Sequence, residues 1–181
     1  LVISAMGYVV MGLGFFTTLG LAGAVFYIFQ DIPVKASLFL IGGVMERETG
    51  TTEVGKMGGL YMHRPLLALS FIVPAFSLAG FPPFPGFWGK LTLVQAGLAT
   101  ENYLIVAIAL LVGVLTLLVV AQVWARAFWS PAREEGLVST DSPLQRSVLQ
   151  APIVVIGVAL LAVGLYAQPL FDLAQQAAAN L

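Results

Sequence analysis

Residues 77–90 read SLAGFPPFPGFWGK, and the prolines in this stretch determine what kind of helix can form here. The stretch lies in an apolar segment, about 65–98, whose one charged residue is Lys90. Three prolines and two glycines within residues 79–86 cannot stay in a regular helix, because proline lacks the backbone N–H. As one helix the segment would be about 51 Å long, too long for one upright crossing and too short for two. We therefore predict a discontinuous transmembrane helix.

The predicted break contains Pro82, Pro83, Pro85 and Gly86, and Lys90 follows it by about one helical turn. Irregular backbone is tolerated in a bilayer only where protein covers it or water solvates it. In transporters, broken helices mark the path of the ion or substrate. We therefore predict that Lys90 lies on the path of a transported ion or substrate. The alternative is a simple kink, with Lys90 extending to the membrane interface.

The rest of the chain is also apolar. Of its 181 residues 59% are hydrophobic and 9% charged, whereas soluble domains carry roughly 25% charged residues. These proportions predict an all-α polytopic membrane protein, a single transmembrane domain over residues 1–181 with about five transmembrane helices. The predicted spans are about 1–16, 20–45, 65–98 (broken near 80–86), 103–126 and 150–169.

Composition also excludes several classes of function. The net charge is −1 without a basic tract, so we expect no nucleic-acid partner. The chain has no cysteine and one histidine, His63, so we expect neither a metal site nor a cofactor. Because no nucleophile–base pattern appears, we expect a transporter subunit and not an enzyme. The chain begins inside an apolar segment without a signal-peptide pattern, as a piece of a longer protein would.

The loop cations predict the orientation in the membrane. With one crossing per segment, the loops about 46–64 and 127–149 lie on the same side, and the other connections carry no Lys or Arg. The positive-inside rule makes that side cytoplasmic and the C-terminus external, in a multi-pass protein of the cell inner (plasma) membrane. The six cations in these loops and at their edges are Arg47, Lys56, Arg64, Arg126, Arg133 and Arg146.

A charged pair lies in the middle of the segment 20–45. Asp31 and Lys35 are four residues apart and therefore share a helix face, with Tyr27 one turn earlier and Gln30 adjacent. Two ionisable groups in mid-bilayer cost a few kcal/mol each, so they are paired, shielded from lipid or used. Lysine suits proton transfer because burial disfavours its charged form, whereas arginine stays charged. We predict Asp31 and Lys35 in the proton path and Tyr27 and Gln30 as residues that line it; a static salt bridge is the alternative.

Two other features concern packing. Four glycines near the start of the chain predict close approach of neighbouring helices: Gly12, Gly14, Gly20 and Gly23. Residues 170–181 combine leucine and phenylalanine with aspartate and glutamine, which predicts a short amphipathic tail at the membrane interface.

Two stretches resemble a known family, the antiporter-like membrane subunits of respiratory complex I and of multisubunit Mrp-type cation/proton antiporters. Residues 26–43, FYIFQDIPVKASLFLIGG, are similar to the family's lysine-bearing helix, and residues 77–90 are similar to its broken helix. Residues 3–8, 49–51 and 57–61 fit the same order. Within the family, the Asp-x-x-x-Lys form with a Thr-Gly-Thr loop most resembles the D subunits of the Mrp antiporters.

The resemblance implies the fold and the function. By resemblance the chain is the C-terminal portion of such a subunit, the last five of about fourteen helices, holding most of the second inverted repeat. The implied function is secondary monovalent cation/proton antiport, with protons moving through Lys35 and Lys90, and Asp31 setting the charge of Lys35. The implied partners are other membrane subunits of a hetero-oligomeric antiporter complex, the lipid bilayer, protons and Na⁺ or another monovalent cation.

The chain departs from the family pattern at two positions. Mrp-like sequences usually carry a histidine where Gln30 stands and a glutamine near Ala5. Glutamine cannot relay a proton as histidine can, so these departures give Lys35 more weight.

Two other functions stay open from the sequence alone. One is a proton-pumping membrane subunit of an NADH:quinone oxidoreductase or a related hydrogenase, in which redox chemistry elsewhere supplies the energy. The other is a structural membrane subunit whose charges form static pairs. Replacing each lysine separates the structural case from the two transport cases, because only transport requires a lysine that releases its proton.

Overall fold

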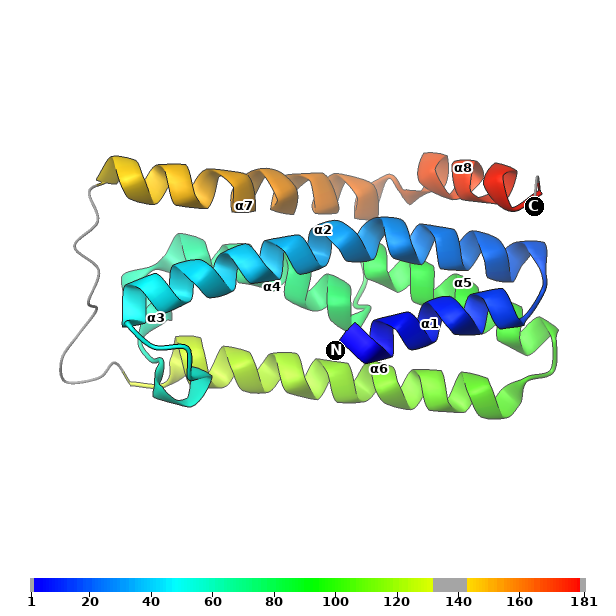
Figure 1. Ribbon diagram of the computed structural model, residues 1–181, viewed down its shortest axis with the longest axis horizontal. Coiled ribbons are helices and arrows are strands. Elements are labelled where there is room, and N and C mark those ends of the chain that lie inside the picture. The colour runs from blue at the N-terminus through cyan, green and yellow to red at the C-terminus, as the bar shows by residue number, and fades with distance from the viewer. Residues whose placement is uncertain (1, 132–142, 180–181) are drawn as a thin grey trace.

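The computed structural model describes residues 2–131 and 143–179, and in that part of the chain every regular element is a helix (Figure 1). This confirms the predicted all-α class. The elements are α1 (Val2–Gly14), α2 (Thr18–Thr49), the 3₁₀ turn η1 (Val54–Lys56), α3 (Leu60–His63), α4 (Pro65–Ala79), α5 (Pro85–Ala99), α6 (Tyr103–Trp124), the π-helical turn η2 (Ala125–Trp129), α7 (Pro143–Leu165) and α8 (Ala167–Ala179).

Three stretches of described helix are long and apolar enough to cross a membrane, namely Thr18–Thr49, Tyr103–Trp129 and Ser147–Leu165. The helices α1 and α4 are shorter and also apolar. The helices α4 and α5 have 15 residues each and are the two halves of the predicted discontinuous helix. Each half is about 22 Å long, so neither crosses a bilayer core of about 30 Å alone.

The central helix α2 extends beyond the predicted span 20–45. It begins after Thr17, whose Oγ1 accepts a hydrogen bond from the Gly20 N–H, and it ends at Gly50 with φ 68°. The charged sequence Glu46-Arg47-Glu48 therefore continues the helix. Charge sets how much of a helix can lie in the bilayer core, but it does not end the helix itself.

Glycine and proline together form the break between α4 and α5. Gly80 ends α4 in the left-handed conformation, with φ 82°, and its N–H donates to the Phe76 and Ser77 carbonyl oxygens, both at 3.0 Å. Pro85 is the first residue of α5, where the missing proline N–H has no helical partner to lose. The turn between them is short, and the chain resumes its helix after five residues.

Glycines allow α1 and α2 to pack closely. A Cβ atom built on Gly12 would lie 2.6 Å from Leu93 and 2.7 Å from the Gly20 carbonyl oxygen. Gly23 is similarly tight, with Leu93 at 3.0 Å, whereas Gly14 faces open space. The predicted close approach is confirmed at Gly12, Gly20 and Gly23 and is wrong at Gly14.

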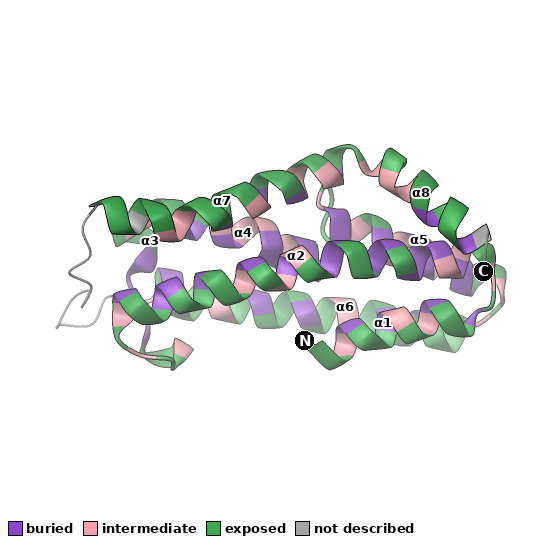
Figure 2. Ribbon diagram, turned by 45° about the horizontal axis from the view of Figure 1, so that its top comes forward, coloured by how far each residue is buried: buried purple, intermediate pink, exposed green. Residues whose placement is uncertain are grey.

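The segment predicted as an amphipathic tail forms α8, which runs along α2 (Figure 1). Ala174 and Ala178 are buried against Ala22, and the rings of Phe26 and Phe171 meet edge to face at 6.2 Å. The alanines are four residues apart, so they present a narrow face that fits closely against α2. Figure 2 shows buried positions on the side of α8 that faces this helix.

One end of the molecule gathers the connections that carry cations. The end of α2, α3, the end of α6 and the start of α7 lie together at the left of Figure 1. The Gly59 N–H donates to the Ser130 carbonyl oxygen at 2.8 Å, which joins the two connections. Arg64 pairs with the buried carboxylate of Glu48 at 2.7 Å. Arg133 and the side chain of Arg146 lie outside the described residues.

Candidate functional site

The predicted charged pair is present in the middle of α2. The Lys35 Nζ donates a hydrogen bond to the Asp31 Oδ2 at 2.5 Å, and the side chains of Lys35 and Asp31 are 20% and 10% exposed. The helix continues through Pro33, between the two residues. The other carboxylate oxygen, Asp31 Oδ1, is buried and accepts no hydrogen bond from the described residues.

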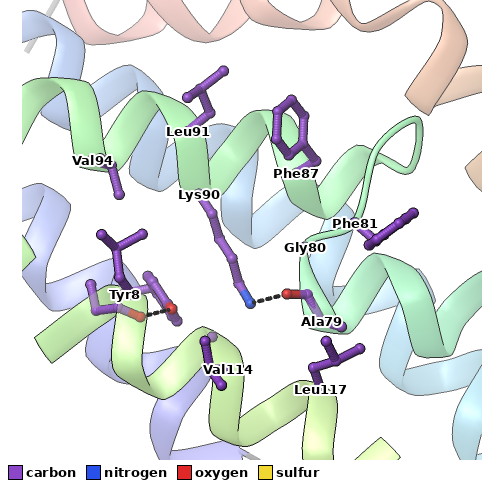
Figure 3. A pocket seen from close by; sticks show the side chains of 13 residues that line it. Tyr8, Ala79, Gly80, Phe81, Phe87, Lys90, Leu91, Val94, Val114 and Leu117 are labelled. Carbon is purple, nitrogen blue, oxygen red and sulfur yellow. Dashed lines mark hydrogen bonds between the residues drawn. The ribbon is translucent and has the colours of Figure 1, made fainter. Parts of the chain in front are cut away.

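Lys90 turns back toward the break in the helix (Figure 3). Its Nζ donates to the carbonyl oxygens of Leu78 at 2.8 Å and Ala79 at 3.1 Å. The last carbonyls of a helix have no helical partner and lie at the negative end of its dipole, so both groups attract an ammonium. The lysine therefore donates hydrogen bonds to the carbonyl groups that the break leaves without a helical partner, and its side chain does not extend to an interface.

Asp31 links the two lysines electrostatically. Besides its ion pair with Lys35, its carboxylate interacts with the charge of Lys90. Because Asp31 belongs to α2 and Lys90 to α5, the packing of these two helices brings the predicted path residues together. The buried carboxylate of Asp31 therefore forms an ion pair with Lys35 on its own helix and interacts electrostatically with Lys90 on α5.

Gln30 ties α2 to both halves of the broken helix. Its Oε1 accepts a hydrogen bond from the Ser77 hydroxyl at 3.1 Å, and the Ser77 Oγ accepts one from the Gly86 N–H at 3.2 Å. Gln30 and Ser77 are 2% and 0% exposed. This chain fixes the end of α4 and the start of α5 relative to the charged pair.

The four predicted break residues differ in their surroundings. Pro82 and Pro83 are exposed, whereas Pro85 and Gly86 are buried. A Cβ atom on Gly86 would overlap the Ser77 carbonyl oxygen, so a larger residue cannot occupy this position without moving α4. Glycine is therefore required here by the close approach of the two half-helices.

Sequence reasoning missed Tyr8, which lies beneath Lys90. The Lys90 Nζ is 5.0 Å from the centre of the Tyr8 ring, and this ring stacks on the predicted Tyr27 at 5.3 Å. A cavity of about 290 Å³ adjoins Tyr8, Gly80 and Lys90, and its other lining residues are apolar side chains of α5 and α6, with Ala79 and Phe81 at the break (Figure 3). A tyrosine in an apolar helix gives no signal by itself, because most such residues only pack.

Metal ligands are not clustered in the part of the chain that the structure describes. Within residues 2–131 and 143–179 no group of three or more His, Asp or Glu side chains is placed to hold a metal ion.

Comparison with known proteins places this geometry in a family. The family model described as "NADH:quinone oxidoreductase/Mrp antiporter, TM" matches residues 2–116. The chain belongs to this family. It is 43% identical over 177 residues to the D subunit of the Na(+)/H(+) antiporter of Alkalihalophilus pseudofirmus, covering 98% of this chain and 35% of that protein. It is 35% identical over 133 residues to the Bacillus subtilis protein of the same name, and this match covers 74% of this chain and 27% of that protein.

Solved structures agree with this assignment. The Mrp complex from Dietzia sp. DQ12-45-1b contains a chain that matches 98% of this one, with a TM-score of 0.86 and 33% identity, over 40% of its own length. A chain of respiratory complex I from Thermus thermophilus, solved with bound aureothin, shares the fold with a TM-score of 0.66 and 23% identity. The match covers 94% of this chain and 44% of that one. The predicted resemblance to the D subunits of Mrp antiporters is thus confirmed. The chain spans about a third of the length of the curated relatives it matches, and it is a multi-pass membrane protein of this family.

Proposed function

We propose that this chain is part of a subunit of a monovalent cation/proton antiporter and that it carries protons through Lys35 and Lys90. Support comes from relatives that are named as D subunits of Na(+)/H(+) antiporters, at 43% and 35% identity. Its partners are then the other membrane subunits of an Mrp-type complex, and its cargo is Na⁺ or another monovalent cation exchanged for protons. The family also includes subunits of NADH:quinone oxidoreductase, but the named relatives favour antiport.

One observation carries the proposal, the position of Lys90 at the break. Its amine contacts two carbonyl oxygens freed by the end of α4, beside a cavity of about 290 Å³. The carbonyls stabilise the ammonium, while the apolar surroundings favour the neutral amine. These opposing effects suit a group that alternates between its two protonation states.

Asp31 couples the two lysines in this mechanism. When both lysines are protonated, their ammonium groups share the single carboxylate of Asp31. Each lysine then binds its proton less tightly than it would if the carboxylate interacted with that lysine alone. Loss of the proton from Lys90 leaves Asp31 to stabilise Lys35, so a proton is retained on one lysine as the other releases its own.

The orientation is part of the same proposal. The end of α2, α3 and the end of α6 lie together at one end of the molecule, and the positive-inside rule assigns the side that carries the loop cations to the cytoplasm. The chain then spans the cell inner membrane with its C-terminus on the external side. Proton entry from outside is driven by a membrane potential that is negative inside, worth about 2.3 kcal/mol per charge per 100 mV.

The test replaces Lys90 by arginine and by alanine in the complete native complex, with antiport measured in everted membrane vesicles. Arginine keeps the charge but does not release its proton, so Lys90→Arg is expected to lower the antiport rate by at least about tenfold, as Lys90→Ala does. Lys56→Arg is the matched control, because Lys56 is an exposed loop residue paired with Glu53. Near-normal antiport by Lys90→Arg, in a complex shown to be assembled, would overturn the proposal and leave Lys90 a structural residue.

A further inference from the structure

Tyr8 is the aromatic residue that faces the amine of Lys90. The amine lies over the ring, 5.0 Å from its centre, and two other contacts of the amine go to the Leu78 and Ala79 carbonyls. Tyr8 is 5% exposed, so water does not screen this contact strongly. The face of an aromatic ring is electronegative and attracts a cation that lies within about 6 Å of its centre.

The ring of Tyr8 is fixed in place from two sides. Its hydroxyl donates to the Ala109 carbonyl oxygen of α6 at 2.5 Å, and the ring stacks on Tyr27 of α2 at 5.3 Å. Leu93 and Ala5 pack in the same buried cluster. A ring held in this way cannot follow the lysine, so its distance from the amine depends on the conformation of Lys90.

We propose that Tyr8 is a positioning residue that stabilises the protonated form of Lys90 through the face of its ring. The inference rests on the proposed function, in which Lys90 binds and releases protons. The hydroxyl of Tyr8 serves a different purpose, since its hydrogen bond to Ala109 orients the ring and does not reach the lysine. The π face therefore affects the proton equilibrium of Lys90, and the hydroxyl does not act on it directly.

Few other charges face Lys90. From α2, Asp31 and Tyr27 are the titratable neighbours, and Lys35 is paired with Asp31. The sequences of α4 and α5 contain no further titratable residue, that of α6 contains Tyr103 at its first position, and that of α7 contains Arg146 in its first turn. A change in the proton equilibrium of Lys90 on altering Tyr8 can therefore be assigned to the ring.

The experiment alters the ring electrostatics without altering its shape. Position 8 of the full-length subunit carries phenylalanine or phenylalanine with one, two or three ring fluorines, introduced by nonsense suppression in the complete complex. Each fluorine weakens the negative face of the ring, so the pH profile of antiport is expected to move stepwise to more acidic values relative to Tyr8→Phe. The full series should span about one pH unit, the size expected for a partly desolvated ammonium over a ring.

Phe26 provides the control, because it is buried on the side of α2 that faces Phe171. The same fluorinated series at position 26 is expected to leave the pH profile in place. An unchanged profile across the series at position 8, when Lys90→Arg lowers antiport by at least about tenfold in the same assay, would overturn this inference alone. Near-normal antiport by Lys90→Arg would overturn the proposed function, and the inference would fail with it.

Discussion

At the scale of single residues, the carboxylate of Asp31 pairs with Lys35 and also interacts electrostatically with Lys90. One of its oxygens is bonded to Lys35, and the other is buried without a hydrogen-bond donor in the described residues. A buried carboxylate in this position is stabilised by positive charge on its neighbours. Its replacement by a neutral isostere should therefore alter proton binding and leave the shape of the site intact.

Asp31→Asn removes the charge and keeps the volume. Without the carboxylate the protonated form of Lys35 is less stable, so the pH profile of antiport is expected to shift by about one unit to more acidic values. The profile is measured in everted vesicles that contain the complete complex. Glu53→Gln is the control, because the Glu53–Lys56 pair is exposed, with side chains 63% and 56% accessible. An unchanged profile for Asp31→Asn in an assembled complex would contradict the coupling.

Gln30 acts through hydrogen bonds, and its replacement tests that role. In Gln30→Leu the buried Ser77 hydroxyl loses its acceptor, which is expected to destabilise the fold by about 1–3 kcal/mol. The measurement is the thermal midpoint of the solubilised complex. Gln122→Leu serves as the comparison, since Gln122 is exposed on α6. Equal midpoints for both variants would show that the tie between α2 and the break contributes no stability.

At the scale of the elements, small residues determine how closely helices approach α2. Gly89 of α5 lies against Tyr27, and a Cβ atom added to Gly89 would be 3.2 Å from the Tyr27 ring. Gly12 of α1 lies against Gly20 in the same way. These contacts bring Tyr8 and Lys90 to the same side of α2. The position of the charged residues therefore depends on residues that carry no charge.

Gly12→Ala and Gly14→Ala form a matched pair within α1. An added methyl group at Gly12 would meet Leu93, Gly20 and Ala24, whereas nothing lies within 4 Å of the same group at Gly14. Gly12→Ala is expected to destabilise the fold by about 1–3 kcal/mol, while Gly14→Ala is close to neutral. The thermal midpoint of the solubilised complex distinguishes them. A lower midpoint for Gly14→Ala than for Gly12→Ala would contradict the α1–α2 packing.

At the scale of the whole molecule, the helices leave a large apolar surface on α6. Its exposed side chains include Leu104, Leu111 and Leu118. In its most apolar stretch, 22% of the residues are buried against the rest of the chain. Water cannot cover such a surface, so lipid or neighbouring helices cover it. This agrees with a multi-pass protein that spans about a third of its relatives.

The orientation in the membrane gives a prediction for the whole molecule. A reporter inserted after residue 55 or after residue 138 is expected to read cytoplasmic, and one after Leu181 external, because the loop cations lie on one side. Residue 55 belongs to the turn η1, and residue 138 lies outside the described residues. Opposite readings at residues 55 and 138 would show that the number of crossings between them is odd.

Most of the fold followed from local sequence, because its causes are local. Three prolines within residues 82–85, just after Gly80, interrupt a helix without help from other elements, although single prolines such as Pro33 are accommodated within one. The spacing of Asp31 and Lys35 places them on one face of any helix. The glycine contacts were predictable in kind but not one by one, since Gly12 and Gly14 look alike in the sequence. Only the neighbour across the interface distinguishes them.

The sequence by itself determined the helical class, the broken helix with Lys90 beyond it, and the pairing of Asp31 with Lys35. Each of these depends on residues within a few turns of one another. The tertiary structure decided which groups meet Lys90: the Leu78 and Ala79 carbonyls across the break, the ring of Tyr8 from α1, and the field of Asp31 from α2. These partners come from other helices or across the turn, and which residues meet there depends on how the helices pack against α2 and not on the spacing of residues within one helix.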